Sequence, residues 1–398
     1  MEPEKNFKVP GFSASAVSGD IRKKGDGRLD MGLIFCRGDA SAAGVFTRNS
    51  MAAAPVILCR ERLKMGTARA ILVNSGNANC MTGQAGMEDA RELCREVGRL
   101  LEIHEESVLN SSTGVVGVPL PIEDMGAALG PLVRGLSEDG MEPFSRAILT
   151  TDTRSKTFAV DLDLSGGPVR VLGVAKGTGM IAPNMATMLA FILTDASVPP
   201  GELHGILHGA VEGSFNAVTV DGDTSTNDTV LMLASGMGPA LGSERDRLLF
   251  RDGVGEVCRA LARQLVADGE GAARVVEVLV VGADDNSQAK LAARAVAQSL
   301  LVKTALAAAD PNWGRIAVAV GYSGAGVHPE DLSLFIGNVA ILRGGEPVSG
   351  YREEDAVKIM VRDSYTIRIS LGSGTGTASI LTTDLTEEYV RINSEYRS

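Results

Sequence analysis

The fold of this chain is organised around one stretch, Gly173-Val-Ala-Lys176-Gly-Thr-Gly179-Met-Ile-Ala-Pro183-Asn184-Met-Ala186-Thr187-Met-Leu-Ala-Phe-Ile-Leu-Thr-Asp195. Its composition predicts a strand, a glycine-rich loop closed by Pro183-Asn184, and an apolar run that begins with Thr187. Glycine has no side chain and tolerates positive φ, so such a loop lets backbone amides approach a ligand closely. A threonine where this loop becomes a buried strand is held on a rigid element. It either satisfies a turn or offers its hydroxyl for chemistry.

The composition limits the class of protein. The 398 residues suffice for two or more domains, and 44% hydrophobic with 22% charged residues is ordinary for a soluble globular protein. A net charge of −11 argues against binding to nucleic acids or acidic membranes, which requires clustered Lys and Arg. No apolar run approaches the roughly 20 residues of a membrane span, and the N-terminus lacks the features of a signal peptide. The five scattered cysteines form no C-x-x-C pair, so we expect reduced thiols and a cytoplasmic protein.

Periodicity predicts a mixed α and β protein with extensive sheet. Apolar residues at three- and four-residue spacing predict helices at 88–101, 203–211, 257–268 and 289–301. Runs rich in β-branched residues predict strands at 33–36, 44–47, 68–73, 169–174, 274–281, 365–371 and 379–381. A change of pattern after Gly282 divides the chain into a first region, 1–282, and a C-terminal domain, 283–398.

Several familiar ligand motifs are present only in incomplete form. Gly177-x-Gly179-x-x-Ala182 resembles a dinucleotide fingerprint, but that fingerprint opens a helix, and Pro183 followed by an apolar run does not. The loop 221–228 begins like a calcium loop but lacks the glycine at position six and the glutamate at position twelve. His204 and His208 lie one turn apart without a third zinc ligand nearby. We therefore expect no metal and no bound cofactor.

Three loops rich in small polar side chains remain, at 111–114, 150–153 and 221–228. A site without histidine or metal can still transfer an acyl group if its nucleophile supplies its own base. An N-terminal threonine does so, because its α-amine has a pKa of roughly 7.7–8.0 and accepts the hydroxyl proton. Thr187 is internal, so this chemistry requires that the chain is first cut before it.

The segment 176–189 closely resembles the self-cleavage segment of the ornithine acetyltransferase (glutamate N-acetyltransferase) family. The likeness extends in order over nearly the whole chain, at 43–47, 74–79, 113–114, 150–153, 221–228, 268–271, 301–305, 310–315 and 389–393. Departures are small: Ser155 stands where a proline is common, Thr178 where serine is usual, and Ser398 where threonine also occurs. The identification rests on the number and order of the matches, since no single one decides it.

The resemblance implies an enzyme of arginine biosynthesis that cuts itself between Ala186 and Thr187. The products are an α chain, 1–186, and a β chain, 187–398, in an α2β2 assembly. The mature Thr187 would take the acetyl group of N2-acetylornithine as an ester and pass it to glutamate, with ping-pong kinetics. The implied fold is an αββα sandwich of the α+β class with a smaller C-terminal α+β domain.

The resemblance also assigns roles to individual residues. The Thr113 hydroxyl and the Gly114 amide match the oxyanion hole. Substrate-binding positions carried over from the family are Thr150, Lys176, Thr187, Glu270, Asn393 and Ser398. Both substrates carry an α-carboxylate while their side chains end in opposite charges, so one pocket needs a cation and an anion, which Lys176 and Glu270 can supply. We predict that Glu270 faces the ornithine ammonium.

Two questions stay open at the level of sequence. Some family members also accept acetyl-CoA as a donor, and these residues do not decide whether this chain does. The alternative enzyme is an amidase or aminopeptidase with an N-terminal threonine nucleophile on the same fold, which would deliver the acyl group to water. A homologue that stays uncut and acts as a binding protein is the non-enzymatic alternative.

Overall fold

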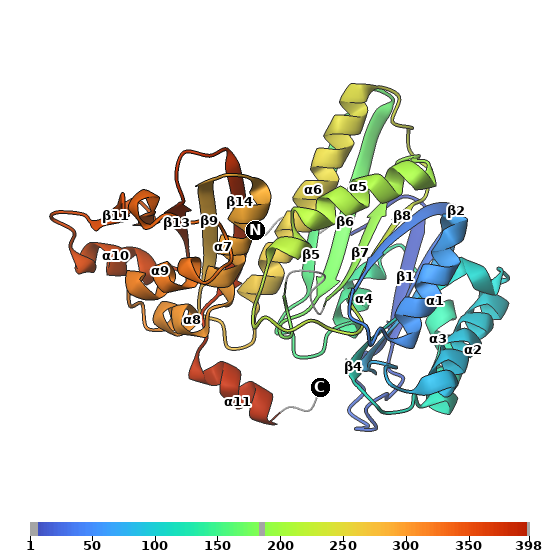
Figure 1. Cartoon of the computed structure of the whole chain (residues 1–398). Helices are drawn as coiled ribbons and strands as arrows, with labels where there is room; N and C mark the ends of the chain where they lie inside the picture. Colours follow the sequence, from blue (N-terminus) through green and yellow to red (C-terminus); the bar gives the residue numbers. More distant parts are fainter. Residues whose placement is uncertain (1–6, 183–187, 396–398) are drawn as a thin grey trace, which may run out of the picture.

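The computed structural model describes residues 7–182 and 188–395, and its strands form two sheets (Figure 1). The strands of the first sheet are β1 (Phe12–Val17), β2 (Met31–Phe46), β3 (Thr67–Asn77), β4 (Val108–Val115), β5 (Lys156–Leu164), β6 (Gly167–Lys176), β7 (Leu189–Thr194) and β8 (Thr229–Ala234). They follow the order β4-β3-β2-β8-β7-β6-β5, and β1 pairs with β2. The long β2 pairs first with β1 and β3 and then with β8, so the strands predicted at 33–36 and 44–47 are one continuous strand.

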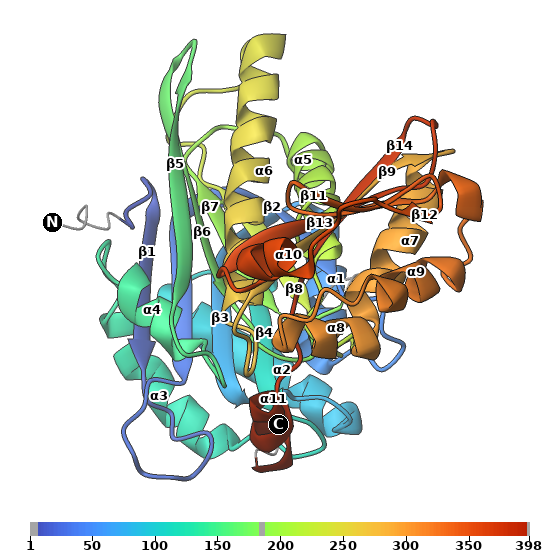
Figure 2. The same cartoon turned by 90° about the vertical axis from the view of Figure 1, so that its left-hand side faces the viewer.

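Helices cover both outer faces of this sheet (Figures 1 and 2). The helices of the first region are α1 (Ala54–Arg62), α2 (Gly83–Leu101), α3 (Ile122–Arg134), α4 (Met141–Ala147), α5 (Pro200–Glu212) and α6 (Glu244–Ala267). Helices α2 and α3 share a buried core with one face of β2 and β3, whereas α5 and α6 share another with one face of β6, β7 and β8. A third core lies between the two halves of the sheet.

The alternation of side chains along β7 shows these layers. Leu189, Phe191 and Leu193 pack into the core between the sheet halves, while Ala190 and Ile192 face α5 and α6. Successive side chains of a strand point to opposite faces, so a strand covered on both faces reads as one apolar run. The layer order is helix, sheet, sheet, helix, which confirms the predicted αββα sandwich.

The predicted helices are present, but several of their ends differ from the prediction, and α2 already begins at Gly83. Helix α6 begins at Glu244, earlier than the predicted 257, because Ser243 and Asp246 form a capping box at its start. The predicted helix 289–301 is two helices, α7 (Asn286–Gln298) and α8 (Leu300–Ala307). The break falls at Ser299, whose extended backbone ends α7 and whose side chain accepts the amide of Val302 to cap α8.

The second sheet has its own apolar core. Its strands are β9 (Val275–Ala283), β10 (Ser333–Ile336), β11 (Val339–Arg343), β12 (Glu346–Pro347), β13 (Ser364–Ser370) and β14 (Gly376–Thr383), and the remaining helices are α9 (Trp313–Gly321), α10 (Glu353–Met360) and α11 (Glu387–Glu395). Strand β9 pairs with β13 and β14, although the predicted division after Gly282 assigned most of β9 to the first region. Helix α11 stands apart from the rest of this region (Figure 1).

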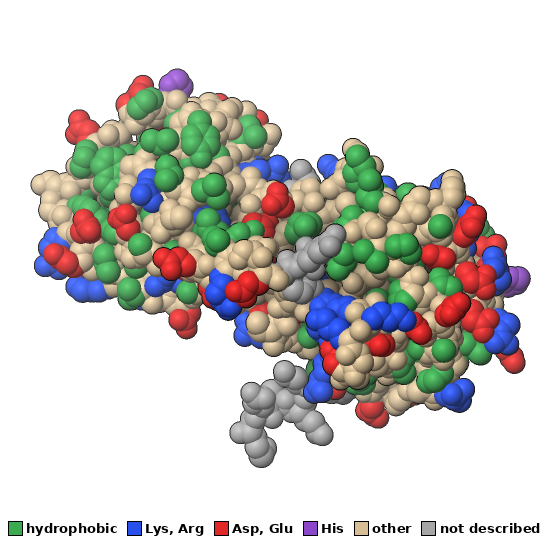
Figure 3. All heavy atoms as spheres, turned by 90° about the horizontal axis from the view of Figure 1, so that it is seen from below, with side chains coloured by type: hydrophobic (Ala, Val, Ile, Leu, Met, Phe, Trp, Pro, Cys, Tyr) green, Lys and Arg blue, Asp and Glu red, His purple; other side chains and the backbone are tan. Residues whose placement is uncertain are grey.

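The two regions lie side by side when the molecule is viewed from below (Figure 3). On this face Asp and Glu side chains are interspersed with Lys and Arg. The five cysteines are all buried and unpaired, as predicted for reduced thiols. Within residues 7–182 and 188–395, we find no helix with the length and apolar character needed to cross a bilayer.

Candidate active site

A cavity of about 280 Å3 lies where β4 and β6 meet several loops and α11. Segments far apart in the sequence line it. Among the lining residues are six of the predicted site positions: Thr113, Gly114, Thr150, Lys176, Glu270 and Asn393. The other predicted positions, Ala186, Thr187 and Ser398, lie outside the described residues.

Lys176 ends β6 and is buried between β5 and β7, which places its ammonium inside the cavity wall. The ammonium donates to Thr150 Oγ1 at 2.8 Å and to Thr113 Oγ1 at 3.2 Å. Burial lowers the pKa of Lys176, and the nearby Lys156 lowers it further, while Asp152 and acidic side chains around the cavity act in the opposite direction.

The predicted oxyanion pair lies in β4, beside β3. Gly114 has φ +134° and packs against Gly76 so closely that a Cβ on Gly114 would lie 2.3 Å from the Gly76 carbonyl carbon. Only glycine fits this backbone, since it has no Cβ and adopts positive φ without strain. Thr113 and Gly114 both line the cavity, beside the Lys176 ammonium.

Glu270 and Asn393 form the other wall of the cavity. Asn393 Nδ2 donates to Glu270 Oε2 at 2.9 Å, and the Glu270 amide donates to the Thr178 carbonyl at 3.1 Å. A Cβ on Gly179 would lie 2.4 Å from the Glu270 carboxylate, so a side chain at this position would displace the carboxylate. Tyr389 donates to Asp221, which also accepts the amide of Met180, so α11 is attached to the glycine loop.

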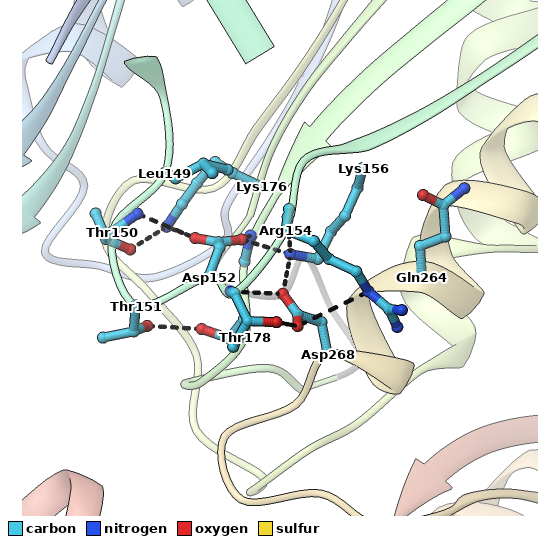
Figure 4. Close-up of polar contacts among 12 residues, drawn as sticks. Leu149, Thr150, Thr151, Asp152, Arg154, Lys156, Lys176, Thr178, Gln264 and Asp268 are labelled. Atoms are coloured by element: carbon cyan, nitrogen blue, oxygen red, sulfur yellow. Dashed lines mark hydrogen bonds and ion pairs between the residues drawn. The ribbon is translucent and has the colours of Figure 1, made fainter. Parts of the chain in front are cut away.

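A buried network of charges lies behind Lys176 (Figure 4). Lys156 Nζ donates to Asp152 Oδ1 and to Asp268 Oδ2, both at 2.6 Å. Asp152 Oδ1 also accepts the amide of Gly177 at 2.6 Å, and its Oδ2 lies 3.9 Å from Lys176 Nζ. Although burial raises the pKa of Asp152, the two lysines bring it down to about 2. Asp152 is therefore a buried carboxylate that is charged at neutral pH.

A profile of the ArgJ family matches residues 13–398. The chain belongs to the ArgJ family. A relative named arginine biosynthesis bifunctional protein ArgJ, from Geobacter sulfurreducens, is 46% identical over 394 residues, which is 98% of this chain and 100% of the relative. Another of the same name, from Chlorobium chlorochromatii, is 47% identical over 398 residues, which is 99% of this chain and 92% of the relative.

A solved ArgJ chain from Bacillus halodurans is also similar. It is 41% identical with a TM-score of 0.50, and the match covers 52% of this chain and 98% of that chain. Membership of the ArgJ family confirms the predicted resemblance and the predicted class, an acyltransferase of arginine biosynthesis.

In this ArgJ-family chain, sequence reasoning missed the role of the charge network. Asp152 and Asp268 belong to segments that match the family, and Lys156 belongs to no such segment. Lys156 and Asp268 are 112 residues apart, and no local spacing signals that they meet. Among the described residues, no group of three or more His, Cys, Asp or Glu side chains could hold a metal ion.

Asp228 is a second residue that sequence reasoning left without a role. Its side chain is buried, and Oδ1 accepts the amide of Met188 at 3.3 Å, while Oδ2 has no hydrogen-bond partner among the residues that the structure describes. Burial raises the pKa of Asp228 well above its ordinary value. Met188 directly follows Thr187 in the sequence, so this carboxyl contacts the second residue of the predicted β chain.

Proposed function

We propose that the chain transfers the acetyl group of N2-acetylornithine to glutamate through an acetyl ester of Thr187. One observation carries the proposal: six residues that the family resemblance assigned to the site line a single cavity. They come from β4, β6, two loops and α11. Chance would not be expected to bring such distant positions together. The name of the relatives, arginine biosynthesis bifunctional protein, supports the same pathway.

The first step makes the nucleophile. The Thr187 hydroxyl attacks the carbonyl carbon of Ala186, the peptide C–N bond breaks, and the resulting ester is opened by water. This frees the Thr187 α-amine, which can then accept the hydroxyl proton. We propose that the two chains stay together after the cut, because β6 before it pairs with β7 after it. The cavity also takes Thr113 and Lys176 from one chain and Glu270 and Asn393 from the other.

The second step transfers the acetyl group. The Thr187 oxygen attacks the acetyl carbonyl carbon while the α-amine takes the hydroxyl proton. The negative charge that develops on the carbonyl oxygen is stabilised by the Thr113 hydroxyl and the Gly114 amide, where one such donor contributes about 2.7–4 kcal/mol. The C–N bond then breaks, and the proton passes to the departing amine of ornithine. Glutamate reverses these steps with its own α-amine and leaves as N-acetylglutamate.

The charges of the cavity match the substrates. The Lys176 ammonium is a buried cation suited to the carboxylate that both substrates carry. Glu270, held by Asn393, is an anion suited to the side-chain ammonium of acetylornithine. If Glu270 meets this ammonium, Glu270→Gln raises KM for acetylornithine. An unchanged activity toward acetylornithine would show that the assignment is wrong.

Intact mass, N-terminal sequencing and product analysis of the purified protein test the main proposal. The parent is expected to give two chains, one of which begins at Thr187, and to form N-acetylglutamate from acetylornithine and glutamate. Thr187→Ala is expected to remain one chain without transferase activity. A parent that stays uncut would refute the mechanism. Free acetate as the only product would favour the alternative amidase.

Three further properties are proposed from the family alone. We propose acetyl-CoA as a second acetyl donor, which the word bifunctional in the names of the relatives supports. Formation of N-acetylglutamate from acetyl-CoA and glutamate without acetylornithine tests this. We also propose an α2β2 assembly and a cytoplasmic location, which native mass and cell fractionation test.

A further inference from the structure

Asp152 connects the two segments that carry Thr150 and Lys176. Its Oδ2 accepts the amide of Thr150 at 3.0 Å, and its Oδ1 accepts the amide of Gly177, the residue after Lys176, at 2.6 Å. The same carboxylate lies 3.9 Å from the Lys176 ammonium. One buried side chain therefore fixes two backbone segments and faces the cation between them (Figure 4).

Lys156 and Asp268 hold Asp152 in turn. The Lys156 side chain has no exposure to solvent and bridges both carboxylates at 2.6 Å. Asp268 also accepts the amide of Thr153 at 3.1 Å, and it lies two residues before Glu270. The two lysines and two aspartates balance in charge. Burial of ions is costly unless they are paired in this way, so the members of the network depend on one another.

Lys176 determines how the neighbouring hydroxyl groups are oriented. An ammonium has only donors, so the oxygens of Thr113 and Thr150 accept from it, and their own hydrogens must point away from Lys176. Thr113 lines the cavity, so its hydrogen is available to a ligand there. The position of the ammonium thus decides whether Thr113 acts as a donor in the cavity.

We infer that Asp152 is a positioning residue that holds the Lys176 ammonium against Thr113 and Thr150, so that the Thr113 hydroxyl donates to the oxyanion. Lys156 and Asp268 fix the orientation of Asp152. This inference rests on the proposed acetyl transfer, and it gives Lys176 a role in addition to contact with substrate. The ammonium only donates, whereas a neutral Lys176 amine has a lone pair that can accept the hydrogen of the Thr113 hydroxyl, so transferase activity depends on the protonation of Lys176.

The test is the alkaline limb of the pH profile of kcat/KM for acetyl transfer. Asp152 and Glu270 favour the protonated form of Lys176, and Lys156 opposes it. Asp228 adds to the first effect only above its own raised pKa, because below it this carboxyl carries no charge. Asp152→Asn removes an anion, so the limb moves to lower pH by about 1 unit or more. Lys156→Met removes a cation, so the limb moves to higher pH. A merely structural role of the network would not shift the limb in opposite directions.

Asp246→Asn is the matched control. Asp246 is a buried carboxylate at the start of α6 that accepts the Ser165 hydroxyl and the Ser243 amide, and it does not line the cavity. Asp246→Asn is expected to lose stability and to leave the limb in place. The inference is wrong if the alkaline limb stays in place in self-cleaved Asp152→Asn and Lys156→Met enzymes, or if it moves in the same direction in both.

Asp152→Glu is the second variant, for the case that the uncharged variants do not fold. It keeps the charge but displaces the carboxylate by one methylene, so kcat is expected to fall at least about 10-fold with the limb in place. An Asp152→Glu enzyme as active as the parent would overturn the inference. A parent without acetyl transfer would overturn the proposed function itself, which separates the two failures.

Discussion

Gly114→Ala tests the predicted oxyanion hole at its most sensitive point. The added Cβ would lie 2.3 Å from the Gly76 carbonyl carbon and 2.5 Å from the Asn77 nitrogen. Carbon atoms in contact are about 3.5 Å apart, so β3 and β4 must separate locally by about 1 Å. A misplacement of about 1 Å can cost about 10²-fold in rate, and loss of one oxyanion donor costs about 10²–10³-fold in kcat.

We therefore expect kcat for acetyl transfer to fall about 10²–10³-fold, which corresponds to about 2.7–4 kcal/mol. KM for acetylornithine should change little, because the oxyanion exists only during the reaction. The assay is the rate of N-acetylglutamate formation at saturating substrates, with enzyme whose complete cleavage is verified on a denaturing gel.

Gly167→Ala separates the effect of the clash from backbone strain. Gly167 has φ +125°, similar to Gly114, but an added Cβ would meet no atom within 4 Å. Both variants strain the backbone, and only Gly114→Ala displaces a neighbouring strand. Gly167→Ala is expected to lower Tm and retain the parent kcat. A cut Gly114→Ala enzyme with kcat within about 3-fold of the parent would refute the role of this amide in the oxyanion hole.

Three further predictions concern stability and are measured by urea unfolding of the uncut Thr187→Ala chain. Phe144 is buried between the sheet halves, with its ring centroid 5.5 Å from that of Phe191. Phe144→Ala should therefore lower the free energy of unfolding by about 3–5 kcal/mol. Ser243→Ala removes the cap of α6 and should lower the free energy of unfolding by about 1 kcal/mol. Ser243→Asp is the control, because its side chain can still accept the capping amide, and it should lower this free energy by less. The raised pKa of Asp228 means that the folded protein loses stability as pH rises from about 3.9, the ordinary value, through the folded pKa. Asp228→Asn should remove that loss, so an unfolding free energy with the parent's pH dependence would contradict the burial of a protonated carboxyl.

Periodicity predicted some of the elements, because it reports local burial, and missed others such as α3 and β5. The apolar run that becomes β7 alternates between two cores, and the helix at 203–211 presents Leu203 and Leu207 to one of them. Periodicity did not predict where these helices begin and end. The break at Ser299 and the early start of α6 depend on side-chain caps, which act on the first turn of a helix and leave its apolar spacing unchanged.

The resemblance to the family supplied the αββα layering and the set of site residues to consider. The sequence by itself determined the mixed α and β class and the glycine loop before Thr187. It did so because side-chain size, backbone freedom and apolar spacing act over a few residues. Only the tertiary structure decided which polar side chains meet: Lys176 with Thr113, 63 residues away, and Asn393 with Glu270, 123 residues away. The strength of such pairs depends on distance and burial, which no local pattern encodes. For the same reason Lys156, with no motif of its own, lies in the network behind the cavity.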